Sequence, residues 1–203
     1  MLEFFSHQKE IITKAASILS NLGMVYLALE MRLGKTLIAL ALCQVLEVKS
    51  VVFLTKKKAM SSILSDFERT GYKYRLQVIN YESGQKADYT GVDILILDEA
   101  HVLGTYPKPN DKARMLREVM KNNTKTRVIF LSGTPSPESY SQLFHQFWTI
   151  ARGPWKEYQN FYKWAGKIDA PNYVKVKTKI INGLHLRNYD KADEKRIKAD
   201  LSK

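Results

Sequence analysis

The sequence predicts an α/β fold in which helices flank a parallel β-sheet. Short apolar stretches of strand length alternate along the chain with segments whose apolar residues recur at helical spacing. Such alternation is typical of parallel sheets, because each right-handed crossover returns the chain to the same edge of the sheet. Two polar motifs, at residues 30–36 and 98–101, each follow directly on a predicted strand. Ligands bind at this end of the strands in folds of this class.

Five strands are predicted from five apolar stretches. They cover residues 24–29, 50–55, 75–80, 92–97 and 127–131. Three helices are predicted at residues 36–46, 59–69 and 111–121, and the second is expected to end at Gly71. The first of these helices is mostly apolar and is expected to be buried, whereas the other two carry apolar residues on one face.

The composition is that of an ordinary globular protein. The chain of 203 residues is 45% hydrophobic and 26% charged, which suits one domain, or one domain with an appendage, around a sizeable core. The single cysteine, Cys43, lies in the predicted apolar helix, so a buried structural thiol is expected. No signal peptide and no apolar run of membrane-spanning length is present, so the expected location is cytoplasmic.

The charge distribution and the last quarter of the chain suggest a second segment. A net charge of +12 favours a polyanionic partner, although it also serves solubility. We predict a main lobe at residues 1–150 and a basic, aromatic-containing extension at residues 151–203. Its aromatic residues are expected to form its core, residues 174–179 to form a strand, and residues 189–201 to form a charged helix. No stop signal follows that helix, so the chain is expected to continue toward another domain.

The motif at residues 30–36, Glu-Met-Arg-Leu-Gly-Lys-Thr, has the features of a phosphate-binding turn. Gly34 allows close approach of the backbone to a phosphate, Lys35 supplies positive charge, and the Thr36 hydroxyl can ligate magnesium. The amides at the start of the following helix also favour an anion. Taken alone, the loop is explained equally well as a helix cap, because Leu29 stands where such loops usually carry a glycine.

The motif Asp-Glu-Ala-His at residues 98–101 shifts this balance toward nucleotide binding. Asp98 is placed to hold Mg²⁺, directly or through water, and Glu99 to orient and deprotonate an attacking water. The two motifs together predict a site for ATP and Mg²⁺ and hydrolysis of the β–γ phosphoanhydride bond.

Further motifs complete a resemblance to a known family. Ser6-His7-Gln8 precedes the first predicted strand, residues 79–82 close the third, and Ser-Gly-Thr-Pro at residues 132–135 follows the fifth. In this order and spacing the chain resembles the first RecA-like motor lobe of superfamily-two helicases, which are P-loop NTPases. It looks most like the Swi/Snf branch of phage and bacterial type. The Swi/Snf loop typically reads Asp-Glu-Met-Gly-Leu-Gly-Lys-Thr, from which this chain departs at Leu29 and Arg32.

The resemblance implies a role for individual residues. Gln8 would contact the adenine edge, His101 would couple hydrolysis to movement, and Ser132 and Thr134 would link the γ-phosphate to the nucleic-acid face. The implied nucleotide-binding residues are Gln8, Met31, Arg32, Leu33, Gly34, Lys35 and Thr36, with Thr36 and Asp98 on the metal and Lys35, Asp98 and Glu99 catalytic. The implied nucleic-acid contacts are Thr55, Lys56, Lys57, Lys58, Asn80 and Tyr81. For the lysines a solvated loop is the open alternative, and for Tyr81 it is core packing.

The function that the resemblance implies is that of a DNA-dependent ATPase, a helicase-type translocase on double-stranded DNA, in bacterial or phage-infected cytoplasm. The family completes its site with arginines from a second RecA-like lobe, and no such lobe is predicted in these 203 residues. The isolated chain is therefore expected to be a monomer and nearly inactive. Two alternatives remain: another nucleotide enzyme, such as a small kinase, and an ATP-gated nucleic-acid-binding module without turnover.

Overall fold

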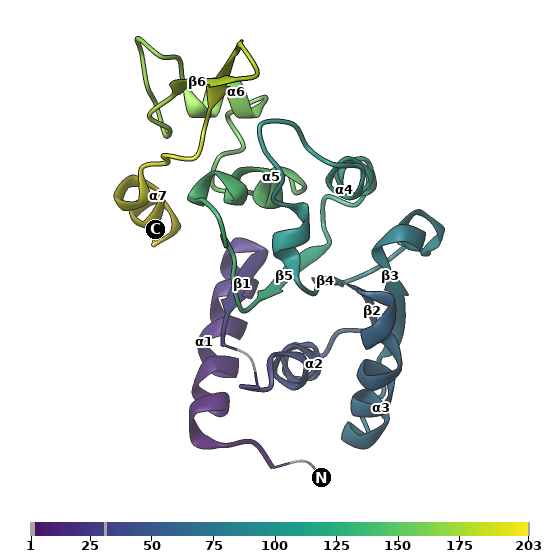
Figure 1. Ribbon diagram of the computed structural model, residues 1–203. Helices are drawn as coiled ribbons and strands as arrows, with labels where there is room; N and C mark the ends of the chain where they lie inside the picture. Colours follow the sequence, from purple (N-terminus) through teal and green to yellow (C-terminus); the bar gives the residue numbers. More distant parts are fainter. Residues whose placement is uncertain (1–2, 31, 203) are drawn as a thin grey trace. The chain divides into compact units, whose positions relative to one another are not determined.

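The computed structural model describes residues 3–30 and 32–202, with the side chain of Ile181 excepted. The chain forms two compact units, which are described separately (Figure 1). Unit 1 comprises Met1–Ala100 and Glu118–Thr134, and unit 2 comprises His101–Arg117 and Pro135–Lys203. The division at residue 150 that the sequence suggests stays a prediction.

Unit 1 is built on a five-stranded parallel sheet, as predicted. Its strands are β1 (Met24–Ala28), β2 (Ser50–Thr55), β3 (Arg75–Asn80), β4 (Ile94–Leu97) and β5 (Arg127–Ser132). They lie in the order β1-β5-β4-β2-β3, and every neighbouring pair is parallel. Strand β4 is buried along its whole length, since a parallel sheet covered on both faces needs continuous apolar runs rather than alternation.

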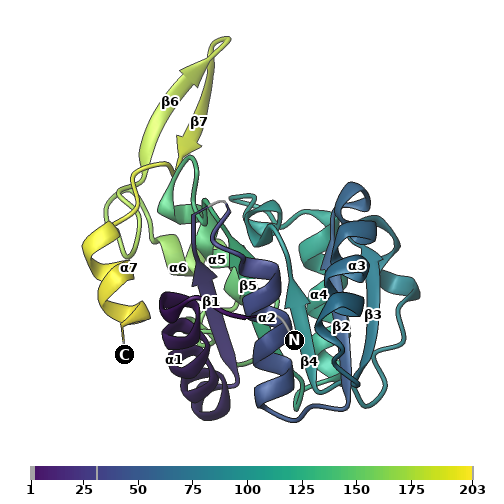
Figure 2. The same ribbon diagram turned by 90° about the horizontal axis from the view of Figure 1, so that it is seen from below.

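Three helices of unit 1 lie on one face of this sheet (Figures 1 and 2). They are α1 (Ser6–Leu22), α2 (Lys35–Val45) and α3 (Met60–Thr70), and their apolar side chains share one core with the strands. Helix α2 is buried from Ile38 to Cys43, so the predicted buried thiol is confirmed. Gly71 ends α3 in the left-handed conformation, with φ of 71°, as its position in the sequence predicts.

Short 3-10 helices follow the strand ends and complete the connections. They are η1 (Lys57–Ala59), η2 (Tyr81–Lys86), η3 (Ala100–Leu103) and η4 (Tyr140–Gln142). Helix α4 (Asp111–Asn122) begins in unit 2 and ends in unit 1. No helix among the described residues is both long enough and apolar enough to span a bilayer.

Unit 2 is organised around aromatic side chains. It contains α5 (Leu143–Trp148), α6 (Phe161–Ala165), β6 (Lys177–Ile181), β7 (Leu184–Asn188) and α7 (Glu194–Leu201). Trp164 is fully buried and stacks on Tyr173 with ring centroids 5.0 Å apart, and Trp155 and Phe161 contact its other sides. The expected aromatic core is therefore present.

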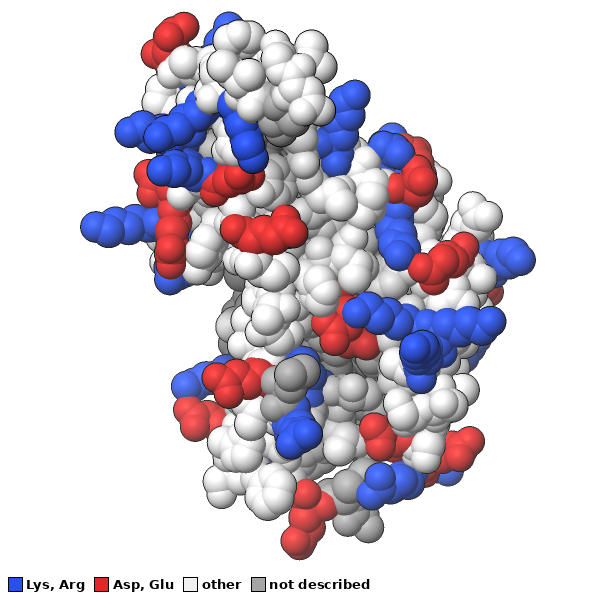
Figure 3. All heavy atoms as spheres, viewed as in Figure 1, with Lys and Arg blue, Asp and Glu red and all other residues white. Residues whose placement is uncertain are grey.

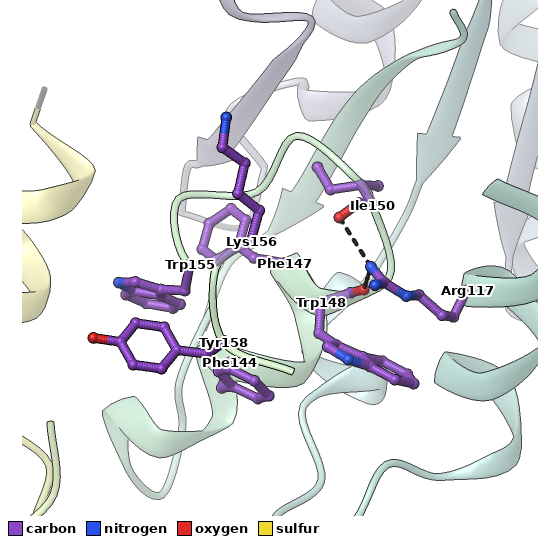
Figure 4. Close-up of a pocket in the computed structure, with 8 residues that line it drawn as sticks. All are labelled: Arg117, Phe144, Phe147, Trp148, Ile150, Trp155, Lys156 and Tyr158. Atoms are coloured by element: carbon purple, nitrogen blue, oxygen red, sulfur yellow. Dashed lines mark hydrogen bonds between the residues drawn. The ribbon is translucent and has the colours of Figure 1, made fainter. Parts of the chain in front are cut away.

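Arg117, in the middle of α4, contacts the end of α5. Its guanidinium donates to the carbonyl of Trp148 at 2.6 Å and to that of Ile150 at 3.3 Å, and it lies 5.0 Å from the Trp148 ring centre (Figure 4). The cavity beside it has a volume of about 10 Å³, which holds one water at most. We therefore interpret this region as packing rather than as a ligand site.

The ribbon formed by β6 and β7 is an element that the sequence interpretation missed. Residues 174–179 were expected to form a single strand, but the strand spans 177–181 and returns antiparallel as β7. Asn182 and Gly183 connect the two strands with φ values of 49° and 76°. Two positive values in succession mark a type I′ turn, for which Asn-Gly is the preferred pair.

Candidate nucleotide site

The sheet of unit 1 brings its predicted site residues to one edge. All five strands run in the same direction, so their carboxyl ends meet there. Strand β1 leads into the loop before α2, β5 ends at Ser132, and β4 leads into Asp98 and Glu99. Because β5 lies between β1 and β4, these three segments are neighbours. Met31 lies outside the described residues, and His101 belongs to unit 2, so its coupling role stays a prediction.

Gly34 forms the turn that starts α2. Its φ is 75°, a value that suits glycine, and it caps the helix without a side chain. A Cβ atom on Gly34 would lie 2.6 Å from Nε2 of Gln8. Gln8 is only 7% exposed; its Nε2 donates to the Leu33 carbonyl at 3.3 Å and its Oε1 accepts from the Phe5 amide at 3.1 Å. Gln8 thus supports the loop through its bond to Leu33. Its contact with adenine stays a prediction.

Lys35 turns its ammonium back onto the loop that precedes it. Its Nζ donates to the carbonyl of Leu29 at 2.8 Å and to that of Glu30 at 2.9 Å. An ammonium carries three N–H donors, so one remains for an anion while both carbonyls stay bonded. These two bonds tie Lys35 to the start of its own loop. They keep its positive charge at the carboxyl edge of the sheet.

Arg32 occupies the left-handed region, with φ of 68°. The Swi/Snf loop typically carries a glycine at this position, and the backbone conformation gives the reason. A residue with a Cβ costs about 1 kcal/mol there. Arg32 and Leu33 are exposed, so their side chains do not pack into the core. The loop therefore keeps the glycine-like turn without the glycine.

Asp98 is held from two sides at the end of β4. Its Oδ2 accepts from the Thr55 hydroxyl at 2.6 Å, and its backbone carbonyl accepts from the Tyr81 hydroxyl at 2.8 Å. Burial raises the pKa of Asp98, and the neighbouring Glu99 raises it further, whereas the Thr55 bond and the Lys35 charge lower it. Lys35 is thus close enough to Asp98 for its charge to favour the ionised carboxylate.

Thr55 and Tyr81 need a correction as predicted nucleic-acid contacts. Thr55 is fully buried and Tyr81 is 3% exposed. Their hydroxyl groups are engaged by Asp98, so neither side chain is available to a nucleic acid in this structure. For Tyr81 the alternative of core packing is the correct one. Both residues instead position the acid, which is a role that sequence reasoning missed.

Glu99 and Ser132 belong to the same region. Glu99 has a φ of 50°, which turns the chain sharply out of β4. Burial raises the pKa of Tyr26, which hydrogen-bonds to the Ser132 side chain, and the charge of Glu99 raises it further. Ser132 is fully buried and accepts from the Thr134 amide at 3.1 Å. Tyr26, on β1, thus contacts the end of β5.

The remaining predicted contacts lie at the ends of β2 and β3. Lys56, Lys57 and Lys58 are all exposed at the start of η1. Asn80 uses its Oδ1 to accept from the Ser83 amide at 2.8 Å, which caps η2. The three lysines are therefore accessible to phosphates, whereas Asn80 already uses its side-chain oxygen to cap η2.

The residues at this edge fit a magnesium-bound nucleotide. Asp98 is a carboxylate whose burial disfavours its charge, and a bound cation would reverse that effect. The Thr36 hydroxyl adds a second oxygen of the kind that Mg²⁺ prefers. No group of three or more His, Cys, Asp or Glu side chains suited to a metal occurs among residues 3–30 and 32–202. A metal here would consequently need phosphate oxygens to complete its coordination, as Mg²⁺ does in nucleotide sites.

Comparisons with known proteins bear on the family and the fold. The family model described as "SNF2-related domain" matches residues 65–201, which is more than half of the chain. The solved structure of the Sulfolobus solfataricus SWI2/SNF2 ATPase core in complex with dsDNA matches with a TM-score of 0.62 and 16% sequence identity. The match covers 79% of this chain and 38% of that one, so the chain spans well under half of the solved core. No curated protein matches significantly.

The structure predicts that alanine at Gly34 is worse than alanine at Gly71. Both glycines have positive φ, 75° and 71°, so alanine should cost about 1 kcal/mol at either. Nothing lies within 4 Å of a Cβ at Gly71, whereas at Gly34 the Gln8 amide must move and lose its bond to Leu33. We expect Gly34→Ala to cost about 1 kcal/mol more in free energy of unfolding, measured by urea denaturation. Equal losses would show that Gln8 does not support the loop.

The positioning role of Tyr81 can be separated from its contribution to stability. Tyr81 and Tyr89 each donate a hydroxyl hydrogen bond of 2.8 Å to a backbone carbonyl, of Asp98 and of Gly84. Replacing either by Phe should lower the free energy of unfolding by about 1 kcal/mol. Only Tyr81→Phe should weaken Mg²⁺-dependent binding of a fluorescent nucleotide, by about tenfold. Similar nucleotide affinities for the two variants would assign Tyr81 to packing alone.

Proposed function

Because the chain belongs to the SNF2-related domain family, we propose that unit 1 is the ATP-binding lobe of a DNA-dependent ATPase that translocates on double-stranded DNA. One observation carries this proposal. The neighbouring strands β1, β5 and β4 end in the Lys35 loop, in Ser132 and in the Asp98–Glu99 pair. A lysine, a serine and two acidic residues therefore lie at the same edge of the sheet.

In this proposal each residue performs one elementary task. Lys35 and the first amides of α2 bind the β- and γ-phosphates, and Gln8 contacts the adenine. Thr36 and Asp98 hold Mg²⁺, which when bound neutralises charge on the phosphates. Glu99 orients the attacking water and accepts its proton. Ser132 and Thr134 report the state of the phosphate site to the nucleic-acid face, and His101 couples it to movement.

Turnover is proposed to need a second RecA-like lobe. The chain corresponds to 38% of the Sulfolobus protein, whose title describes an ATPase core with dsDNA. An arginine supplied to the transferring phosphoryl group is worth roughly a thousandfold or more in related reactions. A chain that has the Lys35 loop and both acids but lacks that arginine would bind nucleotide weakly, as a monomer, and hydrolyse it slowly. The proposed location is the cytoplasm of a bacterium or of a phage-infected cell.

The test is a parallel measurement of nucleotide binding and phosphate release. For residues 1–203 we expect phosphate release close to background with or without duplex DNA, and for the complete protein strong stimulation by DNA. In the complete protein, Glu99→Gln should keep nucleotide affinity and lose roughly a thousandfold in turnover. Lys35→Ala should abolish binding, whereas the control Lys14→Ala, whose ammonium pairs with Glu10 on α1, should not.

Each alternative outcome would indicate a different function. Brisk DNA-stimulated turnover by residues 1–203 alone would contradict the two-lobe proposal. Wild-type and Glu99→Gln proteins that bind nucleotide equally and show no turnover with DNA would favour the ATP-gated binding module. Phosphoryl transfer to a small acceptor would favour the kinase.

The lysines after β2 are proposed to contact DNA phosphates. Lys56, Lys57 and Lys58 are exposed at the carboxyl end of the strand. Replacing all three with Ala should weaken binding to duplexes of any sequence and lower the slope of log affinity against log salt by about 2 to 3, since each lost phosphate contact removes about 0.9. Fluorescence anisotropy over a salt series measures this slope. An unchanged slope would mean that the lysines form only a solvated loop.

A further inference from the structure

The β6–β7 ribbon of unit 2 is exposed on both faces. The side chains of Leu184, His185, Leu186 and Arg187 are all exposed, as are those from Lys177 to Ile180. Figure 2 shows the two strands projecting away from α5, α6 and α7, with their connecting turn at the far end. A two-stranded ribbon without a packed face is marginally stable by itself, so its persistence needs an explanation.

The base of the ribbon is anchored in the aromatic core. Tyr173, Val174, Val176 and Tyr189 are each buried to at least 95%. The Lys175 amide donates to the Lys191 carbonyl at 2.8 Å, below the last ribbon pair. The Ser141 hydroxyl donates to the Tyr189 carbonyl at 2.6 Å. Together with the type I′ turn, these contacts hold the strands from both ends and leave the middle free of packing.

The ribbon and its base carry a net positive charge. Their basic residues are Lys175, Lys177, Lys179, Arg187 and Lys191, and Asp190, next to Lys191, is the one acidic residue between positions 170 and 192. None of the five forms an ion pair with a described residue. Lys177 lies close enough to Lys191 and Lys175 that their charges lower its pKa. Figure 3 shows Lys and Arg side chains on the part of unit 2 that carries β6, with Asp and Glu side chains among them.

Apolar side chains are exposed beside the turn. Ile180 is 63% exposed, Leu184 65% and Leu186 47%. Side chains alternate between the two faces of a ribbon, so the pair Lys179 and Leu186 lies on one face and the pair Ile180 and His185 on the other. Each face therefore carries basic or polar residues and an apolar residue closer to the turn.

We infer that this ribbon is a separate DNA-binding element, which enters a groove of duplex DNA with its lysines on the phosphates and its apolar tip against sugars and base edges. The inference rests on the proposed function, which supplies DNA as the partner. A two-stranded ribbon fits the major groove, and apolar residues inserted among base steps are a recurrent device of DNA-binding proteins. An acidic protein fits less well, because lysine is depleted in protein–protein interfaces and positive charge dominates protein–DNA interfaces.

The test compares two sets of three lysines in unit 2 that carry the same charge. The first variant replaces Lys175, Lys177 and Lys179 with Gln, and the control makes the same replacement at Lys156, Lys163 and Lys167, which are also exposed but lie outside the ribbon and its base. Binding of residues 1–203 to a fluorescein-labelled duplex is followed by anisotropy over a salt series. We expect the ribbon variant to lower the salt slope by about 2 to 3 and the control to leave it unchanged. Thermal unfolding midpoints confirm that both variants are folded.

A second variant tests the tip independently of charge. Ile180→Ser with Leu184→Ser should weaken duplex binding by roughly tenfold at every salt concentration, because apolar contact is lost while the phosphate contacts remain. The salt slope should stay at the wild-type value. A tip variant that binds DNA like the wild type would overturn the insertion of the tip.

Two results would overturn the whole inference. One is an equal change of slope in the ribbon and control variants, which would reduce the effect to net charge. The other is a ribbon variant that loses binding to poly-glutamate but not to DNA, which would identify a protein-docking surface. Binding of Mg-ATP is measured in the same samples. Failure of the wild type to bind Mg-ATP would remove the proposed nucleotide function while leaving the ribbon result interpretable.

Discussion

The carboxyl group of Asp98, at the end of a buried strand, is the feature on which the arrangement of the site in unit 1 depends. Strand β4 is apolar throughout, so Asp98 leaves it in surroundings that disfavour a charge. Thr55 and Tyr81, from the ends of β2 and the loop after β3, hold its side chain and its carbonyl. Lys35 acts on the same acid from the loop after β1. Residues from three other segments thus surround Asp98 at this edge of the sheet. A cation bound beside Asp98 would stabilise its charged form.

Backbone strain is concentrated at the same edge. Arg32 and Glu99 are two of the four non-glycine residues with positive φ among those described, and each follows a strand that leads into the proposed site. Each conformation costs about 1 kcal/mol or more. The hydrogen bonds of Lys35 to Leu29 and Glu30 offset part of that cost at the first position. Strain of this kind persists where the surrounding structure holds a functional geometry.

Unit 2 solves a different physical problem. Its aromatic core, centred on Trp164 and Tyr173, buries the base of the β6–β7 ribbon, whereas the described side chains farther along the two strands are exposed. The family match extends through this region to residue 201, so the ribbon lies within the matched family domain. That match begins at residue 65 and therefore does not include the loop from Leu29 to Thr36. The matched segment does include Asp98 and Glu99.

The sequence by itself determined the α/β class, the five strands, the buried Cys43 and the two motifs, because apolar periodicity and turn chemistry are local properties. Tertiary structure decided which side chains share a site. Thr55 and Tyr81 lie 43 and 17 positions from Asp98, and only the strand order β1-β5-β4-β2-β3 makes them its neighbours. Gln8 supports Gly34 for the same reason, since packing joins α1 to the loop. The ribbon depends on both levels. The pair Asn182-Gly183 is a local signal for its turn, whereas its exposure follows from the tertiary structure, in which no other element of unit 2 packs on the described side chains of its strands.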